Sequence, residues 1–281
     1  MTSLVALPAG SEALIRVRGS ESMLAFGQRL TEWYAKKNPG VRFDVAALQT
    51  VSSFAAMAGG KAEIVESPRR VLNSEKEALK SATGKDYVEV HVATEVAGIA
   101  VNPANPVKAL SLFQLRQVLS GSVKNWKQVG GQDAPIVLYG REQTSGAREL
   151  LEDEFMGDQE ISSAAKTFAT NAGMVAAVSH DVNGIGFGNV ETRTETSVRF
   201  LAIQPSSSGE GIAPTGEAIR ANRYKLVRPL YFYFAGPPKD ELFRFAEWVL
   251  SQEGQLVVES VAYYPLNAAE REAGRQALAA Q

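Results

Sequence analysis

The feature that most constrains this chain is an alternation of short apolar stretches with longer stretches whose apolar residues recur at helical spacing. In the first pair, residues 13–19 are typical of a strand, and residues 20–37 are typical of a helix that Asn38-Pro39-Gly40 ends. The predicted buried face of that helix consists of Met23, Phe26, Leu30 and Trp33. Strands that alternate with helices predict an α/β fold with mainly parallel sheets flanked by helices.

The alternation continues along the chain. Further strands are expected at residues 41–48, 62–67, 134–142, 184–190, 198–203 and 225–236, with two strand-like runs within residues 87–107. Further helices are expected at residues 50–60, 111–121, 145–155 and 171–181, with two helical stretches within residues 240–266. Residues 74–82 favour a polar helix or a loop, and residues 206–224 favour a loop with a turn.

These elements fall into two sets, and the chain is long enough for each set to form a lobe with its own core. The last strand and the helices after it have no sheet of their own, so we expect them to return to the first set. The predicted division is residues 1–98 plus 229–281 for lobe 1 and residues 99–228 for lobe 2. The chain would cross between the lobes twice, and the two crossing strands would act as a hinge.

The composition excludes several classes of site. The chain has no cysteine, which excludes disulfides, thiol nucleophiles and cysteine metal sites. Its formal net charge of −2 gives no support for bulk attraction to nucleic acid or to an anionic membrane. Its two histidines, His91 and His180, lie far apart in the sequence, and we expect neither a metal nor a cofactor. No apolar run approaches the roughly 20 residues that a membrane span needs.

Three of the expected strands end in hydroxyl-rich turns that each precede a helix: residues 20–22, 49–53 and 141–146. The free amides at the start of a helix, with the positive end of its dipole, favour an anion. A hydroxyl can donate to that anion, a glycine lets it approach the backbone, and Arg141 offers a fork of donors. Ligands of open α/β sheets bind at the carboxyl ends of strands, so the three turns together predict an anion site.

Each turn also has a simpler explanation. Ser and Thr cap helices in many proteins, so any one of the three turns is explained by capping alone. A single arginine such as Arg141 is often part of a surface ion pair. The combination of three turns with one arginine is what favours a binding site.

Several of these stretches resemble the phosphate-binding proteins of ABC transporters. Residues 141–147, REQTSGA, resemble the R-x-x-x-S-G-T element of that family, and residues 111–131 resemble a second family stretch. GSESM, NGIGFGNV and VRPLYFYF resemble further family elements in the same order, so the resemblance covers residues 14–266. It implies a periplasmic-binding-protein fold of two lobes, with a tetrahedral oxyanion held in the cleft between them.

The resemblance also implies which residues hold the ligand. From the first lobe it implies Ser22, the backbone of Met23, Thr50 or the nearby Ser52, and Ser67. From the second lobe it implies Arg141, Ser145 and the backbone amides of Gly146 and Ala147, and we add Gln143 as a candidate contact, since it stands where the family often has a carboxylate.

Three departures from the family pattern bear on which anion is held. Gln143 stands where the family often has a carboxylate, and Ala147 stands where it usually has a threonine. After Ser67, where a second acidic ligand can occur, this chain has Pro68 and Arg69. A carboxylate in the site would accept the proton of phosphate and repel sulfate. With the neutral acceptor Gln143 in its place, that discrimination must come from elsewhere, and phosphate is the best single choice among tetrahedral oxyanions.

The leading interpretation is an extracytoplasmic solute-binding protein, periplasmic or at the cell surface. It would capture phosphate or a similar oxyanion for a membrane ABC transporter permease, as a monomer without a nucleic-acid partner. Residues 1–13 are small and apolar, as in the end of a trimmed secretion signal or in an unstructured terminus. One alternative is a sensor or scaffold of the same fold with a different ligand. Another is an enzyme acting on a phosphorylated substrate, which we do not favour because G-x-x-x-x-G-K-[ST] and G-x-S-x-G motifs are absent and no base neighbours Ser145 in the sequence.

Overall fold

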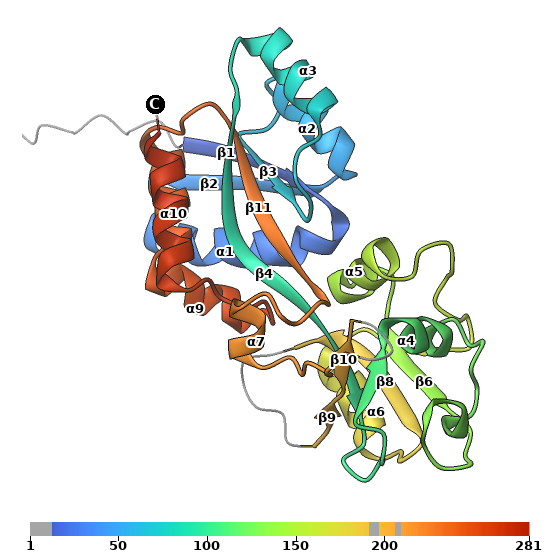
Figure 1. The fold of residues 1–281 in the computed structure, drawn as a ribbon. Helices are drawn as coiled ribbons and strands as arrows, with labels where there is room; N and C mark the ends of the chain where they lie inside the picture. The colour runs from blue at the N-terminus through green and yellow to red at the C-terminus, as the bar shows by residue number, and fades with distance from the viewer. Residues whose placement is uncertain (1–12, 191–196, 206–208, 281) are drawn as a thin grey trace, which may run out of the picture. The chain divides into compact units, whose positions relative to one another are not determined.

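A computed structural model describes residues 13–190, 197–205 and 209–280 of the 281-residue chain (Figure 1). The stretch considered as the end of a secretion signal lies outside the described residues up to residue 12. The chain divides into two compact units: Met1–Val92, Tyr231–Val257 and Ala269–Gln281 form the first, and Ala93–Leu230 and Val258–Ala268 form the second. Strands β4 (Tyr87–Val101) and β11 (Val227–Ala235) each contribute residues to both units, and the predicted lobe boundaries fall within the same two strands.

The other described strands are β1 (Ala13–Gly19), β2 (Val41–Ala47), β3 (Ile64–Ser67), β5 (Ala109–Ser111), β6 (Val137–Arg141), β7 (Lys166–Phe168), β8 (Gly184–Asn189), β9 (Arg199–Phe200) and β10 (Ala202–Gln204). The described α-helices are α1 (Leu24–Lys37), α2 (Thr50–Ala58), α3 (Asn73–Thr83), α4 (Leu112–Leu119), α5 (Gly146–Glu154), α6 (Asn171–Ser179), α7 (Gly216–Arg220), α8 (Asp240–Val249), α9 (Gln252–Ser260) and α10 (Ala268–Ala279). Two short 3-10 helices are η1 (Glu21–Met23) and η2 (Trp126–Val129).

The sheet of the first unit has the strand order β2-β1-β3-β11, with β4 beside β11. β1 pairs in parallel with β2 and β3, and β11 pairs antiparallel with β3. Gly19, at the end of β1, lies opposite Ala47 of β2 and Glu66 of β3. The carboxyl ends of the three parallel strands therefore meet at one edge, which also carries η1 and the start of α2.

Helices cover both faces of this sheet, and β11 shows why its sequence is apolar throughout. Tyr231 and Tyr233 pack with residues of α2 and α3. Phe232, between them, lies against Phe26 of α1 with ring centroids 6.1 Å apart. Successive side chains of a strand point to opposite faces, so a strand with helices on both faces needs apolar residues at both sets of positions.

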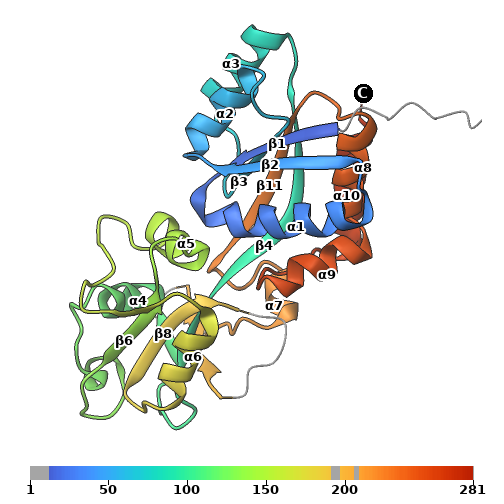
Figure 2. The same cartoon turned by 180° about the vertical axis from the view of Figure 1, so that it is seen from behind.

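The sheet of the second unit has the order β4-β8-β6-β7, with β9 also paired to β4. β6 is parallel to β7 and β8, whereas β8 is antiparallel to β4. Ile185 and Phe187 of β8 pack in one cluster with residues of α4 and α5. Gly186 faces the other way, where a Cβ would lie 2.5 Å from the sulfur of Met174 in α6. Helices therefore cover both faces of this sheet too (Figure 2).

The predicted α/β alternation is confirmed, and most predicted elements are present with shifted ends. Several details of the prediction are wrong, among them the loop with a turn expected at residues 206–224, which contains helix α7. The two runs expected within residues 87–107 form one strand, β4, of 15 residues. The strand expected at 198–203 divides into two short strands. β9 pairs with β4, whereas β10 pairs with β5 in a separate sheet of two strands. The C-terminal helix α10 was not expected, because Leu278 is the only apolar residue within it that is larger than alanine.

A helix able to cross a bilayer is not found among the described residues, since none is both long and apolar enough.

Candidate anion-binding site

The second-unit turn between β6 and α5 ends in a serine that does not cap its helix in the ordinary way. Ser145 has the extended backbone of an N-cap residue (φ −82°, ψ 126°), but its side chain makes no capping hydrogen bond. The residue is 6 % exposed, and its hydroxyl has no hydrogen-bond partner in the described part of the chain. Leaving a buried polar group unsatisfied costs about 1–3 kcal/mol. A ligand oxygen at this position would supply the partner.

The first amides of α5 are available in the same way. The carbonyl oxygen of Ser145 accepts hydrogen bonds from the amides of Arg148 and Glu149. The amides of Gly146 and Ala147, however, have no hydrogen-bond acceptor among the residues that the structure describes. These amides begin a helix of nine residues, so the positive end of the helix dipole adds to their attraction for an anion. One hydroxyl and two amides on a single turn form a donor set that suits a small oxyanion.

Arg141 ends β6, on the same side of the sheet as the Ser145 turn. Its Nε donates to the carbonyl oxygen of Phe168 at 3.3 Å, and its Nη2 donates to that of Ala169 at 3.0 Å. Both carbonyls lie at the end of β7, the strand paired in parallel with β6. The carboxyl edge of the sheet thus holds the guanidinium in place, while the ligand role of Arg141 stays a prediction.

Gln143 is exposed and lines a hollow of about 370 Å³ beside α5. The hollow is also lined by Arg148 and Glu152, which form an ion pair at 2.9 Å. Ser145 is not among its lining residues. Gln143 therefore lies along the outer flank of α5, and its role as a neutral acceptor for the ligand stays a prediction.

A buried ion-pair cluster lies behind the Ser145 turn, and the sequence analysis did not identify it. Arg228 of β11, 4 % exposed, donates from Nε to Oε2 of Glu95 in β4 at 2.8 Å. Its Nη2 donates to Oε2 of Glu149 at 2.9 Å and to the carbonyl oxygen of Gly146 at 3.3 Å. Burial raises the pKa of Glu95, and the charge of Arg228 opposes that shift. The cluster ties the start of α5 to β4 and β11.

The sequence did carry a signal for this cluster. Arg228 interrupts an otherwise apolar strand, and Glu95 immediately precedes the apolar run at the end of β4. A charged residue that is buried in a strand needs an opposite charge. Without a structure, nothing shows that these two residues, 133 positions apart, are each other's partner.

In the first unit, the turn after β1 forms η1 immediately before α1. The hydroxyls of Ser20 and Ser22 form a hydrogen bond at 2.7 Å. The amide of Met23, which the resemblance places at the ligand, donates to the carbonyl oxygen of Ser20 at 3.1 Å. The Met23 side chain is buried beneath the turn. Ser22 remains a predicted ligand contact, whereas the Met23 amide would have to exchange its present acceptor to become one.

The second candidate turn of this unit begins α2. Thr50 is the first helical residue and is partly exposed, and Ser52 is exposed. The N-cap residue Gln49 makes no side-chain capping hydrogen bond, so the start of α2 resembles the start of α5 in this respect. The neighbouring Ser53 is buried, and its hydroxyl donates to the carbonyl oxygen of Gln49 at 3.2 Å. Thr50 and Ser52 stay predicted contacts.

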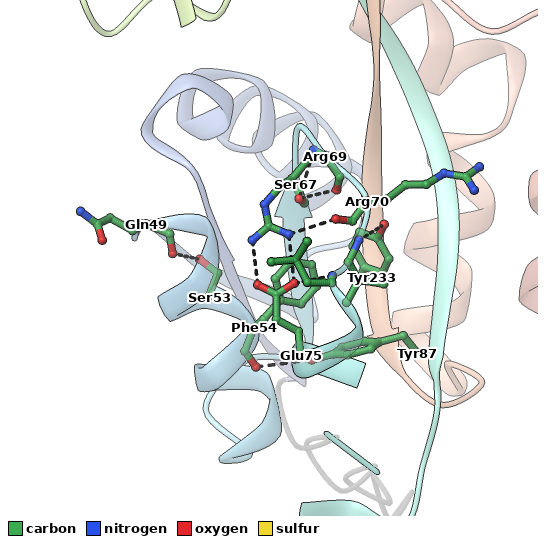
Figure 3. A network of polar contacts seen from close by, with 11 residues as sticks. Gln49, Ser53, Phe54, Ser67, Arg69, Arg70, Glu75, Tyr87 and Tyr233 are labelled. Atoms are coloured by element: carbon green, nitrogen blue, oxygen red, sulfur yellow. Dashed lines mark hydrogen bonds and ion pairs between the residues drawn. The ribbon is translucent and has the colours of Figure 1, made fainter. Parts of the chain in front are cut away.

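The third candidate position of this unit, Ser67, has a buried hydroxyl that is used within its own turn. Its Oγ donates to the carbonyl oxygen of Arg69 at 2.7 Å (Figure 3). Arg69 forms two hydrogen bonds with Glu75, at 3.0 and 2.7 Å. Glu75 also accepts from the amide of Leu72 at the start of α3. Ser67 therefore lies at the predicted edge, but a contact with a ligand would have to replace or share its bond to Arg69.

A family model described as "PBP superfamily domain" matches residues 6–253 of this chain. The chain belongs to the PBP superfamily. Among its relatives in the PBP superfamily is "Phosphate-binding protein PstS" of Staphylococcus epidermidis (strain ATCC 35984), 30% identical over 245 residues, which cover 84% of this chain and 74% of the relative. The protein of the same name from Pseudomonas aeruginosa (strain ATCC 15692) is 26% identical over 266 residues, which cover 89% and 82%. The resemblance to the phosphate-binding proteins of ABC transporters is thereby confirmed.

Solved structures of the PBP superfamily share the fold. A possible phosphate binding protein from Planctomyces limnophilus matches with a TM-score of 0.83 and 25% identity, covering 95% of this chain and 98% of that one. A putative phosphate ABC transporter substrate-binding protein with bound phosphate, from Clostridium perfringens, matches with a TM-score of 0.62 and 25% identity, covering 90% and 100%. The predicted α/β periplasmic-binding-protein fold is confirmed.

Proposed function

We propose that this protein is an extracytoplasmic solute-binding protein that captures phosphate, or a similar tetrahedral oxyanion, for an ABC transporter. The observation that carries the proposal is the uncapped start of α5. There, the buried Ser145 hydroxyl and the amides of Gly146 and Ala147 are all without acceptors among the described residues. The names of the relatives and of the solved structures, which include phosphate-binding proteins and a phosphate ABC transporter substrate-binding protein, support phosphate as the anion.

The proposal treats the protein as a binding protein that performs no catalysis. A serine nucleophile needs a neighbouring base to remove its proton. The Ser145 hydroxyl has no hydrogen-bond partner in the described part of the chain, so no base there is placed to activate it. We propose in addition that the protein acts as a monomer and passes its ligand to a membrane permease. Deleting the gene should then lower phosphate uptake when phosphate is scarce.

The test uses two serines that both occupy N-cap positions in the second unit. Ser145→Ala removes a hydroxyl that caps nothing, and Ser111→Ala removes one that accepts from the amide of Gln114 at 3.1 Å. A hydrogen bond to a charged group is worth about 1.5–3 kcal/mol, so Ser145→Ala should weaken phosphate binding about 10- to 100-fold in calorimetric titration. Its free energy of unfolding without ligand should stay the same or rise, because the buried hydroxyl that it removes makes no hydrogen bond.

Ser111→Ala should show the opposite pattern. The loss of a working cap costs about 1 kcal/mol of stability, while the affinity for phosphate should stay at the wild-type value. If the wild-type protein binds phosphate no more tightly than about millimolar, the proposed function is wrong. If it binds phosphate and Ser145→Ala has no effect, the assigned site is wrong.

A further inference from the structure

The carboxylate of Glu95 lies directly behind the turn that we propose to bind an anion. Its Oε1 is 2.0 Å from the position that a Cβ of residue 146 would take, so a side chain at that position would collide with it. Its Oε2 accepts from Nε of Arg228 at 2.8 Å, and Glu95 is 1 % exposed. The glycine at 146 therefore lets a buried, fixed carboxylate approach the first amide of α5.

Carboxylates outnumber cations in this cluster. Arg228 contacts Glu95 at 2.8 Å, Glu149 at 2.9 Å and Asp153 at 3.7 Å. When all three carboxyl groups are ionised, the cluster carries three negative charges and one positive charge. Glu149 and Asp153 have side chains 30% and 59% exposed, so water screens them more than it screens Glu95. Glu95 is thus the carboxyl group of the cluster that water screens least.

A negative charge behind an anion site discriminates among anions by their charge. Near neutral pH, phosphate is a mixture of the monoanion and the dianion, whereas sulfate is a dianion throughout. Each additional negative charge on the ligand is repelled by a buried carboxylate that solvent hardly screens. Such a site favours the anion that can bind as a monoanion, even when the carboxylate itself makes no contact with the ligand.

We propose that Glu95, held by Arg228 behind Gly146, is a specificity-determining residue that disfavours fully ionised oxyanions such as sulfate relative to phosphate. This inference rests on the proposed function, because it assigns a selectivity to the same anion site. Glu95 would then discriminate between phosphate and sulfate in a chain that has Gln143 at the position where the family often has a carboxylate.

The experiment is calorimetric titration of the full chain with phosphate and, separately, with sulfate. Glu95→Gln removes the charge and retains an oxygen that can accept from Arg228. Glu149→Gln removes a second, less buried charge of the same cluster. Glu154→Gln, at an exposed position of the same helix, is the matched control. Removing one unit charge at short range should shift the ratio of the sulfate and phosphate dissociation constants about tenfold in favour of sulfate for Glu95→Gln.

The shift should be smaller for Glu149→Gln and absent for Glu154→Gln. Tighter sulfate binding is a readout that damage to the fold would not produce. If Glu95→Gln does not fold, Glu149→Gln decides: a shift toward sulfate supports the inference, and an unchanged ratio overturns it. If the wild-type protein binds phosphate and the variants keep its ratio of sulfate to phosphate dissociation constants, the inference is wrong and the proposed function stands. A wild-type protein that binds no phosphate overturns the proposed function and the inference with it.

Discussion

At the scale of single residues, Glu66 is a carboxyl group inside the core of the first unit. It is 1 % exposed, and its Oε1 has no hydrogen-bond partner in the described part of the chain. It occupies space left by two glycines: a Cβ at Gly27 would lie 2.3 Å from Oε1, and a Cβ at Gly19 would lie 2.7 Å from its Cβ. Burial raises the pKa of Glu66 well above its usual range, so folding favours the protonated form of this carboxyl group.

This group should make the stability of the protein depend on pH. Its pKa is raised in the folded state, so the unfolded chain loses the proton at a lower pH than the folded chain does. Its contribution to stability is fully present below the ordinary glutamate pKa and is lost as pH rises toward the raised folded value. Glu66→Gln should remove this part of the decline in denaturant unfolding measured between about pH 5 and pH 9.

Glu77→Gln, at an exposed position of α3, is the control and should retain the wild-type pH profile. An equal decline in stability for wild type and Glu66→Gln would show that Glu66 is already ionised in the folded protein.

Predictions of which residues are buried succeeded where the spacing along one helix determines burial. They failed where burial depends on a residue that is distant in the sequence. Of the four predicted face residues of α1, Met23, Phe26 and Leu30 are buried, but Trp33 is 40 % exposed. Tyr34 takes the fourth buried place, because its ring packs against Phe245 of α8, with centroids 5.1 Å apart. Positions 33 and 34 both fit the spacing, and only the packed helix decides between them.

At the scale of elements, α5 is attached to the strands behind it by charge as well as by packing. Arg228 connects β11 to Glu95 of β4, to Glu149 of α5 and to the first carbonyl of that helix. The position and type of α5 could be predicted from its apolar spacing and its serine. Its attachment could not, because the two strands that supply the charged residues are separated by more than a hundred positions.

Arg228→Met should therefore destabilise the protein strongly. Removing one partner of a buried ion pair leaves an uncompensated charge and costs about 3–5 kcal/mol, which denaturant unfolding measures. The double variant Glu95→Met with Arg228→Met should recover much of that loss, since it leaves no buried charge from this pair. Arg223→Met, which removes an exposed pair with Glu217, should change the free energy of unfolding by less than about 1 kcal/mol. A loss no larger than that of Arg223→Met would contradict the structural role of the cluster.

At the scale of the whole molecule, the fold class could be predicted from the alternation of elements, whereas the exact contacts of the ligand could not. Hydroxyl-rich turns at strand ends identify an edge of each sheet, and the structure places the first-unit turns together at one such edge. It also shows that the Met23 amide and the Ser67 hydroxyl already have partners within the protein. Sequence alone does not distinguish a donor that is used locally from one that is available.

If one anion engages both units, phosphate should slow amide hydrogen exchange in each of them. Mass spectrometry should show protection in peptides that contain the start of α5 and in peptides that contain the start of α2, because bound amides no longer exchange through the same open states. Peptides from α10 should exchange at the same rate with and without phosphate. Protection confined to the start of α5 would restrict the site to the second unit and refute the predicted contacts of Thr50 and Ser52.

The division of the chain between the units also sets an order for its synthesis. The first unit is assembled from three separate stretches, the last of which begins at Ala269. Until β11 leaves the ribosome, β3 lacks its antiparallel neighbour and exposes an edge that can pair with another chain. Most of the second unit is already available by then. A nascent chain of this protein should therefore depend on chaperones for its N-terminal part until β11 has been synthesised.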